Sequence, residues 1–486
     1  MVTALLPYRL ARQAGVAKVP AEQGWQLWLR PEVDTDALQE VLRVHGLPKA
    51  VEHVSAQEYE LRLSTLYQAG ESATAALIEG IGDQVDLDSL MSELPKVEDL
   101  LENDNDAPVI RLINGLFAEA LRLRASDIHV ETFEASLVIR LRVDGHLREV
   151  LRPPRALSTM LVSRIKVMAR LDIAEKRQPQ DGRITLRSAG REVDIRVSTL
   201  PGIYGERVVM RVLDKQASLL DLNNLGMPAE VERGLRACLL RPNGIVLSTG
   251  PTGSGKTTTL YASLNSLNDG SCNILTVEDP VEYAITGIGQ TAINPRAGMT
   301  FASGLRAILR QDPDVIMLGE IRDRETAQIA VQASLTGHLV LSTLHTNSAV
   351  GAVTRLRDMG IEPFLIASSL KGVLAQRLVR RLCACATPQP MNDAERALWP
   401  ELAGLHESFH PQGCDDCQHT GYDGRMGLYE FIELDAGLIE LLYAGASEVV
   451  MHDYLADKRQ SLAAMATDCL RRGETSLAEV LRAVRG

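Results

Sequence analysis

Residues Gly250 to Thr257 constrain the fold of this chain more than any other stretch, because they match the P-loop signature Gly-x-x-x-x-Gly-Lys-Ser/Thr. The preceding residues 244–249 form a short, β-rich apolar run. In the following residues 257–267, leucines recur at helical spacing. A strand, a glycine loop and a helix are the structural context in which this signature binds a polyphosphate, so the stretch predicts a nucleotide site.

The composition of the loop follows from its chemistry. Glycines let the backbone approach the phosphates and aim its N–H groups at them, and the helix N-terminus adds partial positive charge. Lys256 would reach the β- and γ-phosphates, and Thr257 would hold Mg²⁺. The expected ligands are therefore a nucleotide polyphosphate and Mg²⁺. The residues expected to bind the nucleotide are Gly250, Pro251, Thr252, Gly253, Ser254, Gly255, Lys256, Thr257 and Thr258.

Residues 229–380 carry the pattern of a nucleotide domain built on a parallel sheet. Continuous apolar runs alternate with helical patterns, as is typical of strands that are buried on both faces. Beyond the strand before the P-loop, these runs lie at 273–277, 314–318 and 338–343. Parallel strands end at one edge, where such sheets bind ligands, so the polar residues that follow the runs are site candidates.

Three of these polar residues are expected to support catalysis: Glu278, Glu320 and His345. A strand of this kind usually ends in an Asp that serves Mg²⁺, whereas here it ends in Gly319-Glu320. Glu320 is therefore expected to serve the metal shell or to polarise the attacking water. Glu278 and His345 would support the region of the γ-phosphate, and His338 is a further candidate. The alternative is that such acids and histidines cap helices.

Residues 109–228 predict an α+β domain in front of the nucleotide domain. After a helical pattern at 109–123, four segments alternate apolar and polar residues with period two, as half-buried strands do. These segments are 137–143, 183–187, 192–197 and 207–213. Arg196, Arg207 and Arg211 lie on one side of these strands. They either form a solvated strand face or point at a nucleotide.

The two ends of the chain show no catalytic pattern. Residues 1–80 mix short helical patterns, so this segment is either a packing unit or a docking module for a partner. Residues 81–108 contain nine acids and one lysine and predict an exposed acidic linker with a short amphipathic helix inside it. Residues 431–486 carry apolar runs typical of helices.

Residues 381–430 hold a cluster of cysteines. Four of the seven cysteines of the chain lie here in two close pairs: Cys383, Cys385, Cys414 and Cys417. Two thiol pairs favour one tetrahedral Cys₄ zinc site, which would be structural because four thiolates leave no open position. The first pair is Cys-x-Cys, a tighter spacing than usual, and an empty site is the alternative. Three histidines would substitute if one thiol does not reach: His406, His410 and His419.

The composition excludes several classes of protein. A formal net charge of −12 and an aromatic content of 4% count against nucleic-acid binding, which needs a basic face and stacking side chains. No apolar run approaches the roughly 18 residues of a membrane span, and the N-terminal residues form a poor signal peptide. An odd number of cysteines argues against a disulfide framework. We therefore expect a cytosolic protein.

Together, these motifs resemble the secretion ATPase superfamily, which comprises the type II secretion E components, the type IV pilus motors and the type IV secretion motors. Its four signature boxes correspond to residues 250–257, 278–282, 312–323 and 336–347. Residues 125–129, 179–183 and 205–207 are similar to its second N-terminal domain, and residues 5–16 look like the start of type II secretion E components. The chain departs from the family at Cys383-Ala384-Cys385, where the family has Cys-x₂-Cys.

The resemblance implies a RecA-like P-loop NTPase core of α/β class. An α+β (PAS-like) domain would precede this core, and a small zinc segment and a helical C-terminal tail would follow it. The resemblance also implies a homohexamer in which Arg196 and Arg211 close over the phosphates, with Arg310 and Arg355 as further candidates. ATP hydrolysis would then power type II protein secretion by driving assembly of a pseudopilus.

The resemblance also implies a partner and a location. The domain at 1–80 would dock on the cytoplasmic domain of an inner-membrane platform protein, the L-type component, so the chain would be peripheral on the cytoplasmic face of that membrane. Contact with the membrane would run through this partner, and no direct contact with nucleic acid is expected. The alternatives are a type IV pilus or DNA-uptake motor and a nucleic-acid-dependent ATPase with a zinc module.

Overall fold

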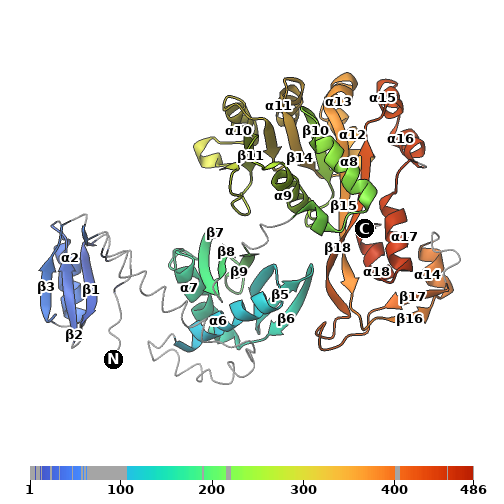
Figure 1. The fold of residues 1–486 in the computed structure, drawn as a ribbon. Coiled ribbons are helices and arrows are strands. Elements are labelled where there is room, and N and C mark those ends of the chain that lie inside the picture. Colours follow the sequence, from blue (N-terminus) through green and yellow to red (C-terminus); the bar gives the residue numbers. More distant parts are fainter. Residues whose placement is uncertain are drawn as a thin grey trace. The chain divides into compact units, whose positions relative to one another are not determined.

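The protein divides into two compact units in a computed structural model. Figure 1 labels the helices and strands of these units. The first unit comprises Met1–Val143 and Leu147–Val212, and the second comprises Asp144–His146 and Leu213–Gly486. The linker expected at 81–108 lies outside the described residues up to position 106. The structure describes residues 6, 11, 14–21, 24–31, 33–45, 47–55, 58, 59, 62, 107–188, 191–214, 221–399, 406–456 and 458–484.

The N-terminal part of the first unit is a small α+β arrangement. Strand β2 pairs antiparallel with β1 and parallel with β3. Its core contains Trp25 and Leu27 of β2, and the buried Tyr59 donates a hydrogen bond through its hydroxyl to the carbonyl oxygen of Ala11 at 2.7 Å. The elements are β1 (Val16–Ala21), β2 (Gly24–Leu29), α2 (Thr35–His45) and β3 (Ala50–His53).

The rest of the first unit is a six-stranded sheet with two helices, which confirms the α+β expectation. The strand order is β6-β5-β4-β9-β8-β7, and all four segments expected to be strands lie within it. Apolar residues of α6 and α7 share one buried cluster with the sheet. The elements are α6 (Ala107–Arg122), β4 (Asp127–Thr132), β5 (Leu137–Val143), β6 (His146–Leu151), η1 (Arg155–Leu157), α7 (Ser158–Met168), β7 (Gln180–Ser188), β8 (Arg191–Leu200) and β9 (Arg207–Asp214).

The second unit contains a seven-stranded sheet in the order β12-β11-β13-β14-β10-β15-β18. The first six strands run parallel, and β18 pairs antiparallel with β15 at the edge. Every residue of β10, β13 and β14 is buried, as expected for strands covered by helices on both faces. The strands are β10 (Gly244–Thr249), β11 (Ile274–Glu278), β12 (Gly289–Ala292), β13 (Val315–Leu318), β14 (Leu339–Leu344), β15 (Leu370–Leu382) and β18 (Tyr422–Glu433).

The helices of this unit begin at recognisable caps. The side chains of Asp323 and Ser348 accept hydrogen bonds from the N–H groups of the first turns of α11 and α12. The elements up to the sheet edge are η3 (Leu222–Leu225), α8 (Ala229–Leu239), α9 (Lys256–Leu267), η4 (Pro295–Ala297), α10 (Phe301–Ile308), α11 (Arg324–Leu335), α12 (Ala349–Asp358) and α13 (Pro363–Ser369).

The C-terminal part of the second unit packs on the same core. The last residues of the segment expected to bind zinc belong to strand β18. This strand pairs with β15 and so joins the segment to the main sheet. None of the helices in the described parts of the chain is long and apolar enough to cross a membrane. The remaining elements are β16 (Thr387–Pro390), α14 (Asp393–Leu398), β17 (Glu407–His410), α15 (Ala436–Tyr443), α16 (Glu448–Leu455), α17 (Leu462–Arg471) and α18 (Leu477–Val484).

Candidate functional site

The carboxyl ends of four parallel strands meet at one edge of the main sheet. Strand β10 leads into the P-loop, β11 ends at Glu278, and β13 is followed by Glu320. Strand β14 is followed by His345 and lies between β13 and β10. The parallel register brings the candidates predicted from the sequence to the same side of the sheet, where open α/β sheets bind ligands.

The P-loop has the predicted strand–loop–helix form. Helix α9 begins at Lys256, directly after Gly255, whose φ of 88° favours glycine. At Gly250 a Cβ would lie 2.5 Å from the carbonyl oxygen of Gln376 in β15, so the chain passes too close to its neighbour for a side chain. The glycines therefore serve both the turn and the packing of the loop against the sheet.

Lys256 is buried inside its own loop. Its Nζ donates hydrogen bonds to the carbonyl oxygens of Gly250 at 2.8 Å and Pro251 at 2.9 Å. Burial lowers the pKa of Lys256 to about 8; Glu320 opposes this shift, and Arg377 adds to it. The ammonium group thus has only neutral oxygens as hydrogen-bond partners in the described residues, and a phosphate would favour its charged form.

Other residues of the loop also suit an anion. The Ser254 hydroxyl is buried and has no hydrogen-bond partner among the residues that the structure describes. Pro251, Thr252, Gly253 and Thr257 are exposed, and Thr258 is half-buried. An unpartnered buried hydroxyl and a folded-back lysine fit a loop that binds polyphosphate, although the part played by each residue stays a prediction.

Glu320 and His345 are brought together as the sequence predicts. Oε2 of Glu320 lies 3.4 Å from Nε2 of His345, and Oε1 accepts a hydrogen bond from Arg322 at 2.5 Å. Burial opposes ionisation of Glu320, but Arg322 and His345 together hold its pKa below the ordinary value. Glu320 is therefore a carboxylate at neutral pH, with an exposed histidine beside it.

Glu278 occupies a different environment from Glu320. Its side chain is 2% exposed and accepts hydrogen bonds from the Tyr261 hydroxyl, from Thr276 Oγ1 at 2.6 Å and from Gln290 Nε2 at 3.1 Å. Burial and the adjoining carboxylate raise the pKa of Tyr261 far above its ordinary value. Donors inside the core thus satisfy Glu278, and the exposed acid at this strand end is Asp279. A role for Glu278 at the γ-phosphate stays a prediction.

The two ends of β14 have separate roles. Beyond its carboxyl end, the Thr346 hydroxyl lies 2.6 Å from the hydroxyl of Thr249, which ties this loop to the entry of the P-loop. At its amino end, Nδ1 of His338 lies 2.8 Å from the carbonyl oxygen of Ala333 in α11. The expectation of His338 as a site candidate is therefore wrong, because this residue caps a helix at the opposite edge of the sheet.

The arginines predicted to close over the phosphates belong to the first unit. Arg211 of β9 pairs with Asp127 of β4 at 3.2 Å, and Arg196 of β8 lies opposite Arg183 of β7 in the antiparallel register. Their contact with a nucleotide stays a prediction. In the second unit, Arg310 donates a hydrogen bond to the carbonyl oxygen of Arg306 at 2.7 Å, and Arg355 lies on α12.

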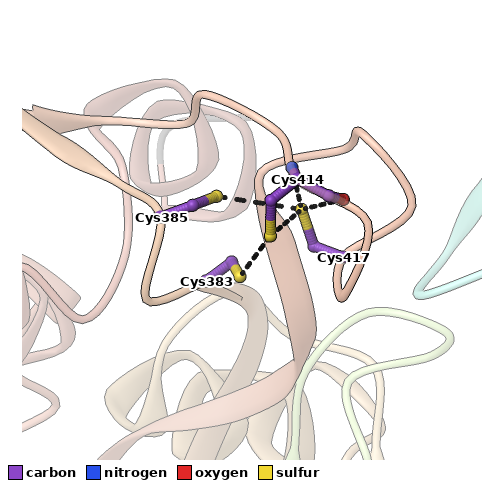
Figure 2. A group of neighbouring side chains, drawn as sticks. All are labelled: Cys383, Cys385, Cys414 and Cys417. Atoms are coloured by element: carbon purple, nitrogen blue, oxygen red, sulfur yellow. Dashed lines mark hydrogen bonds between the residues drawn. The ribbon is translucent and has the colours of Figure 1, made fainter.

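The four cysteines of the predicted zinc site converge (Figure 2). Their sulfur atoms all lie within 4.8 Å of one another. The Sγ–Sγ distances are 3.8 Å from Cys383 to Cys414, 3.8 Å from Cys385 to Cys417, and 3.7 Å from Cys414 to Cys417. Zn–S bonds of about 2.3 Å in a tetrahedron place the sulfurs about 3.8 Å apart. These separations fit zinc and are far longer than the roughly 2.05 Å of a disulfide.

The local backbone favours the thiolate form of one member of this cluster, Cys417. Cys417 accepts hydrogen bonds from the N–H groups of Cys414 and Gly421, both at 3.1 Å. Burial opposes ionisation, but these N–H groups lower the pKa of Cys417 to about 6. Cys385 reaches the cluster despite its tight spacing. The alternative histidine ligands are not needed, because the four thiols already converge. Nε2 of His410 lies 3.4 Å from Oε1 of Glu395, and Nε2 of His419 lies 3.4 Å from Oδ1 of Asp415.

Three residues of the nucleotide edge are not predicted from the sequence. Arg322 pairs with Glu320, while Gln376 and Arg377 of β15 lie against the P-loop. Arg322 follows Glu320 by two residues in a loop with several charges. Gln376 and Arg377 form a polar pair that is buried in the middle of the strand, and such a pair signals a structural or functional demand.

Two family models match the chain. Residues 102–482 match the model described as Type II/IV secretion system protein, and residues 5–67 match a model of one domain of GSPII protein E. Type II secretion system protein E of Aeromonas hydrophila is 54% identical over 483 residues, which cover 99% of this chain and 96% of the relative. Type II secretion system ATPase E of Vibrio cholerae is 57% identical over 453 residues, which cover 93% of this chain and 90% of the relative.

Solved structures with the same fold support this result. The pilus retraction motor PilT with bound ADP is 26% identical, has a TM-score of 0.53 and aligns over 76% of this chain and 95% of its own. The ATPase DotB of Legionella pneumophila is 22% identical, has a TM-score of 0.58 and aligns over 76% of this chain and 94% of its own, a likeness that shows the fold alone. The α/β fold with a RecA-like ATPase core is thereby confirmed.

Proposed function

Since this chain belongs to the type II/IV secretion system protein family and is an ATP-hydrolysing enzyme, we propose that it works as a Mg²⁺-dependent homohexamer that powers type II protein secretion. The main support for the proposal is that the P-loop and the candidate catalytic residues lie at the same edge of the main sheet. Lys256 and Glu320 with His345 meet there at the ends of neighbouring strands. Lys256 would bind the phosphates, and Glu320 with His345 would orient a water beside them.

The residues of this edge divide the chemistry between them. The N–H groups of the P-loop and Lys256 hold the β- and γ-phosphates and neutralise charge that develops as the terminal bond breaks. Glu320 is ionised and accepts a hydrogen bond from the attacking water, which orients it in line with that bond. His345 supports Glu320 and the region of the γ-phosphate. Thr257 would hold Mg²⁺, which supplies further charge neutralisation between the phosphates.

Arginines from the sheet of the first unit complete the proposed mechanism. Arg211 has Asp127 as its partner in the described structure, an ion pair that an incoming phosphate would replace. Arg196 and Arg211 would stabilise the charge spread over the γ-phosphate. After hydrolysis, both arginines would lose their contact with the γ-phosphate. Hydrolysis would thereby drive a rotation between units in a hexamer, and this movement would assemble a pseudopilus.

The N-terminal segment supports a specific partner. Residues 5–67 match a domain that is named for GSPII protein E. We propose that this domain docks on the cytoplasmic domain of an inner-membrane platform protein, which holds the ATPase at the cytoplasmic face of that membrane. The cysteine cluster would bind one structural Zn²⁺, since its four sulfurs already have tetrahedral separations.

The experiment that tests the proposal measures ATP hydrolysis and mass together. Sedimentation with a non-hydrolysable ATP analogue is expected to give a hexamer, and hydrolysis is expected to stop when EDTA removes Mg²⁺. Glu320→Gln should assemble in the same way yet hydrolyse slowly, which separates assembly from chemistry. Full activity of a dilute monomer, or activity that resists EDTA, would contradict the proposal.

The pilus or DNA-uptake motor remains the second candidate. The alignment with PilT supports it, but the relatives that align over nearly the whole chain are named for type II secretion. Binding of residues 1–80 to one platform protein rather than another distinguishes the two. A nucleic-acid-dependent ATPase is less favoured, and stimulation of hydrolysis by DNA would revive it.

A further inference from the structure

Arg377 lies buried against the first residue of the P-loop. Its side chain is on β15, which pairs in parallel register with β10 up to the pair Thr249–Ala375. Residue 377 therefore lies just beyond the point where β10 turns into the P-loop. A Cβ placed on Gly250 would be 3.2 Å from Nη1 of Arg377, and Arg377 is only 6% exposed.

The guanidinium group joins three elements of the second unit. Nη2 donates a hydrogen bond to the carbonyl oxygen of Asn347, in the loop after β14, at 2.8 Å. Nε donates to the carbonyl oxygen of Ala483, in helix α18, at 3.1 Å. Nη1 donates to the carbonyl oxygen of Gln376 at 3.1 Å. A planar fork of this kind fixes its partners more rigidly than a lysine would.

Arg377 has no carboxylate partner among the residues that the structure describes, and its hydrogen bonds there go to neutral carbonyl oxygens. A buried charge without a counter-charge is unfavourable, and burial lowers the pKa of Arg377 accordingly. The charge is felt at the P-loop, because Arg377 also disfavours the charged form of Lys256. A polyphosphate in the loop would place negative charge beside Arg377 and would add to the charge that Glu320 supplies near Lys256.

The neighbouring Gln376 strengthens the connection to the loop. Its Nε2 donates to the carbonyl oxygen of Ser254 at 2.7 Å, and its Oε1 accepts a hydrogen bond from Thr259 Oγ1 of α9 at 2.9 Å. One dipeptide of β15 thus contacts both ends of the P-loop, the loop after β14 and helix α18. A change in any of these elements is transmitted to the others through direct contacts.

We propose that Arg377 is a positioning residue that couples nucleotide in the P-loop to the docking of helix α18. Nucleotide brings negative charge next to the buried Arg377, and Arg377 in turn holds α18 against the core. By reciprocity, nucleotide stabilises docked α18, and docked α18 raises the affinity for nucleotide. The inference rests on nucleotide binding at the P-loop, which the proposed function assumes.

Hydrogen exchange of the full chain with and without Mg-ADP tests the coupling. In the wild type, ADP is expected to slow exchange both in the P-loop and in residues 477–484. Arg377→Met removes the charge and the fork at similar length, so ADP affinity should fall about tenfold, and α18 should no longer respond to saturating ADP. Arg377→Lys keeps the charge and should recover most of the affinity, with a weaker response of α18.

Arg380→Met is the matched control. Arg380 lies on the same strand and pairs with Glu479 of α18 at 2.7 Å, so its loss should loosen α18 directly. Exchange in α18 should rise with and without ADP, while ADP affinity stays within about twofold of wild type. Circular dichroism confirms that each variant is folded.

Three results would overturn the inference. One is an Arg377→Met chain that binds ADP as wild type does, with α18 still responding. Another is an Arg380→Met chain that loses as much affinity as Arg377→Met, because the effect would then come from loosening α18 alone. The third is a wild type whose P-loop is protected by ADP while α18 is not. If ADP does not protect the wild-type P-loop at all, the proposed function fails together with the coupling.

Discussion

Glu320 and His345 face each other across the ends of β13 and β14, with 3.4 Å between Oε2 and Nε2. The contact joins two sequence boxes that are separated by helix α11 in the chain. It depends on the parallel pairing of β13 and β14, which aligns Leu318 with Ser342 shortly before both polar residues. The pairing of strands thus creates the polar edge at which the P-loop also begins.

The first prediction concerns Glu320. Replacing Glu320 by Gln removes the charge that orients water, so the rate of hydrolysis is expected to fall by about a hundredfold or more. Lys256 is untouched, so ATP affinity should change by less than about threefold. Steady-state hydrolysis and nucleotide titration measure the two effects. Equal losses of rate and affinity would indicate that Glu320 binds nucleotide and does not act on water.

A second prediction concerns pH. Burial lowers the pKa of Lys256 to about 8, so without nucleotide the amine loses its proton as the pH rises above this value. Phosphate favours the charged amine, so ADP binding above that pH takes up a proton. ADP affinity should therefore be constant at neutral pH and fall by up to about tenfold per unit above pH 8. Calorimetry in buffers of different ionisation enthalpy detects the proton.

Lys256→Arg provides the control for this pH dependence, because a guanidinium stays charged over the whole range. Its ADP affinity, whatever its absolute value, is expected to be independent of pH between about 7 and 9. An equally steep loss of affinity in this variant would assign the titration to another group.

The cysteine cluster yields a third prediction. Purified protein should contain one zinc per chain, and Cys417→Ser should lose it, because the remaining three thiols cannot complete a closed site. Loss of zinc frees the ends of β15 and β18, so the melting temperature should fall by about 5 °C or more. Cys272→Ser is the control, since Cys272 is exposed and outside the cluster, and it should keep the metal. Full zinc content in Cys417→Ser would show that the cluster is not the site.

The environment of Glu278 leads to a fourth prediction. Tyr261→Phe removes a hydroxyl that donates to a buried carboxylate, so the free energy of unfolding should fall by about 1–3 kcal/mol. Hydrolysis per folded molecule should change far less than in Glu320→Gln, because Tyr261 stays inside the core. Denaturant unfolding and activity measured on the same samples check both parts. A large loss of rate at unchanged stability would place Glu278 in the chemistry itself.

Local patterns in the sequence are sufficient to predict much of the fold. The P-loop, the buried strands and the alternating strands before them each depend on neighbouring residues, and the structure has all of them. The clustering of Glu320 with His345 was also predictable, since parallel strands end at one edge. The cysteine pairs could be matched because only four thiols occur in such close spacing.

The remaining features depend on contacts that no local pattern encodes. Glu278 and Glu320 both follow apolar strands, yet Tyr261 and Gln290 satisfy the first, and an arginine and a histidine flank the second. His338 is a site candidate from the sequence because it adjoins strand β14. It lies at the amino end of this strand, whereas the site lies at the carboxyl end. The role of Arg377 depends on α18, whose last turn lies more than a hundred residues further along the chain.

In the proposed mechanism, an oligomer hydrolyses ATP with arginines of the first unit closing over the nucleotide. The most direct test is the rate of hydrolysis per chain as a function of protein concentration, with Lys256→Ala and Arg211→Ala beside the wild type. We predict that the wild-type rate rises with concentration, that Lys256→Ala abolishes it, and that Arg211→Ala lowers it without loss of fold. A rate that is independent of concentration and unaffected by Arg211→Ala would contradict the claim.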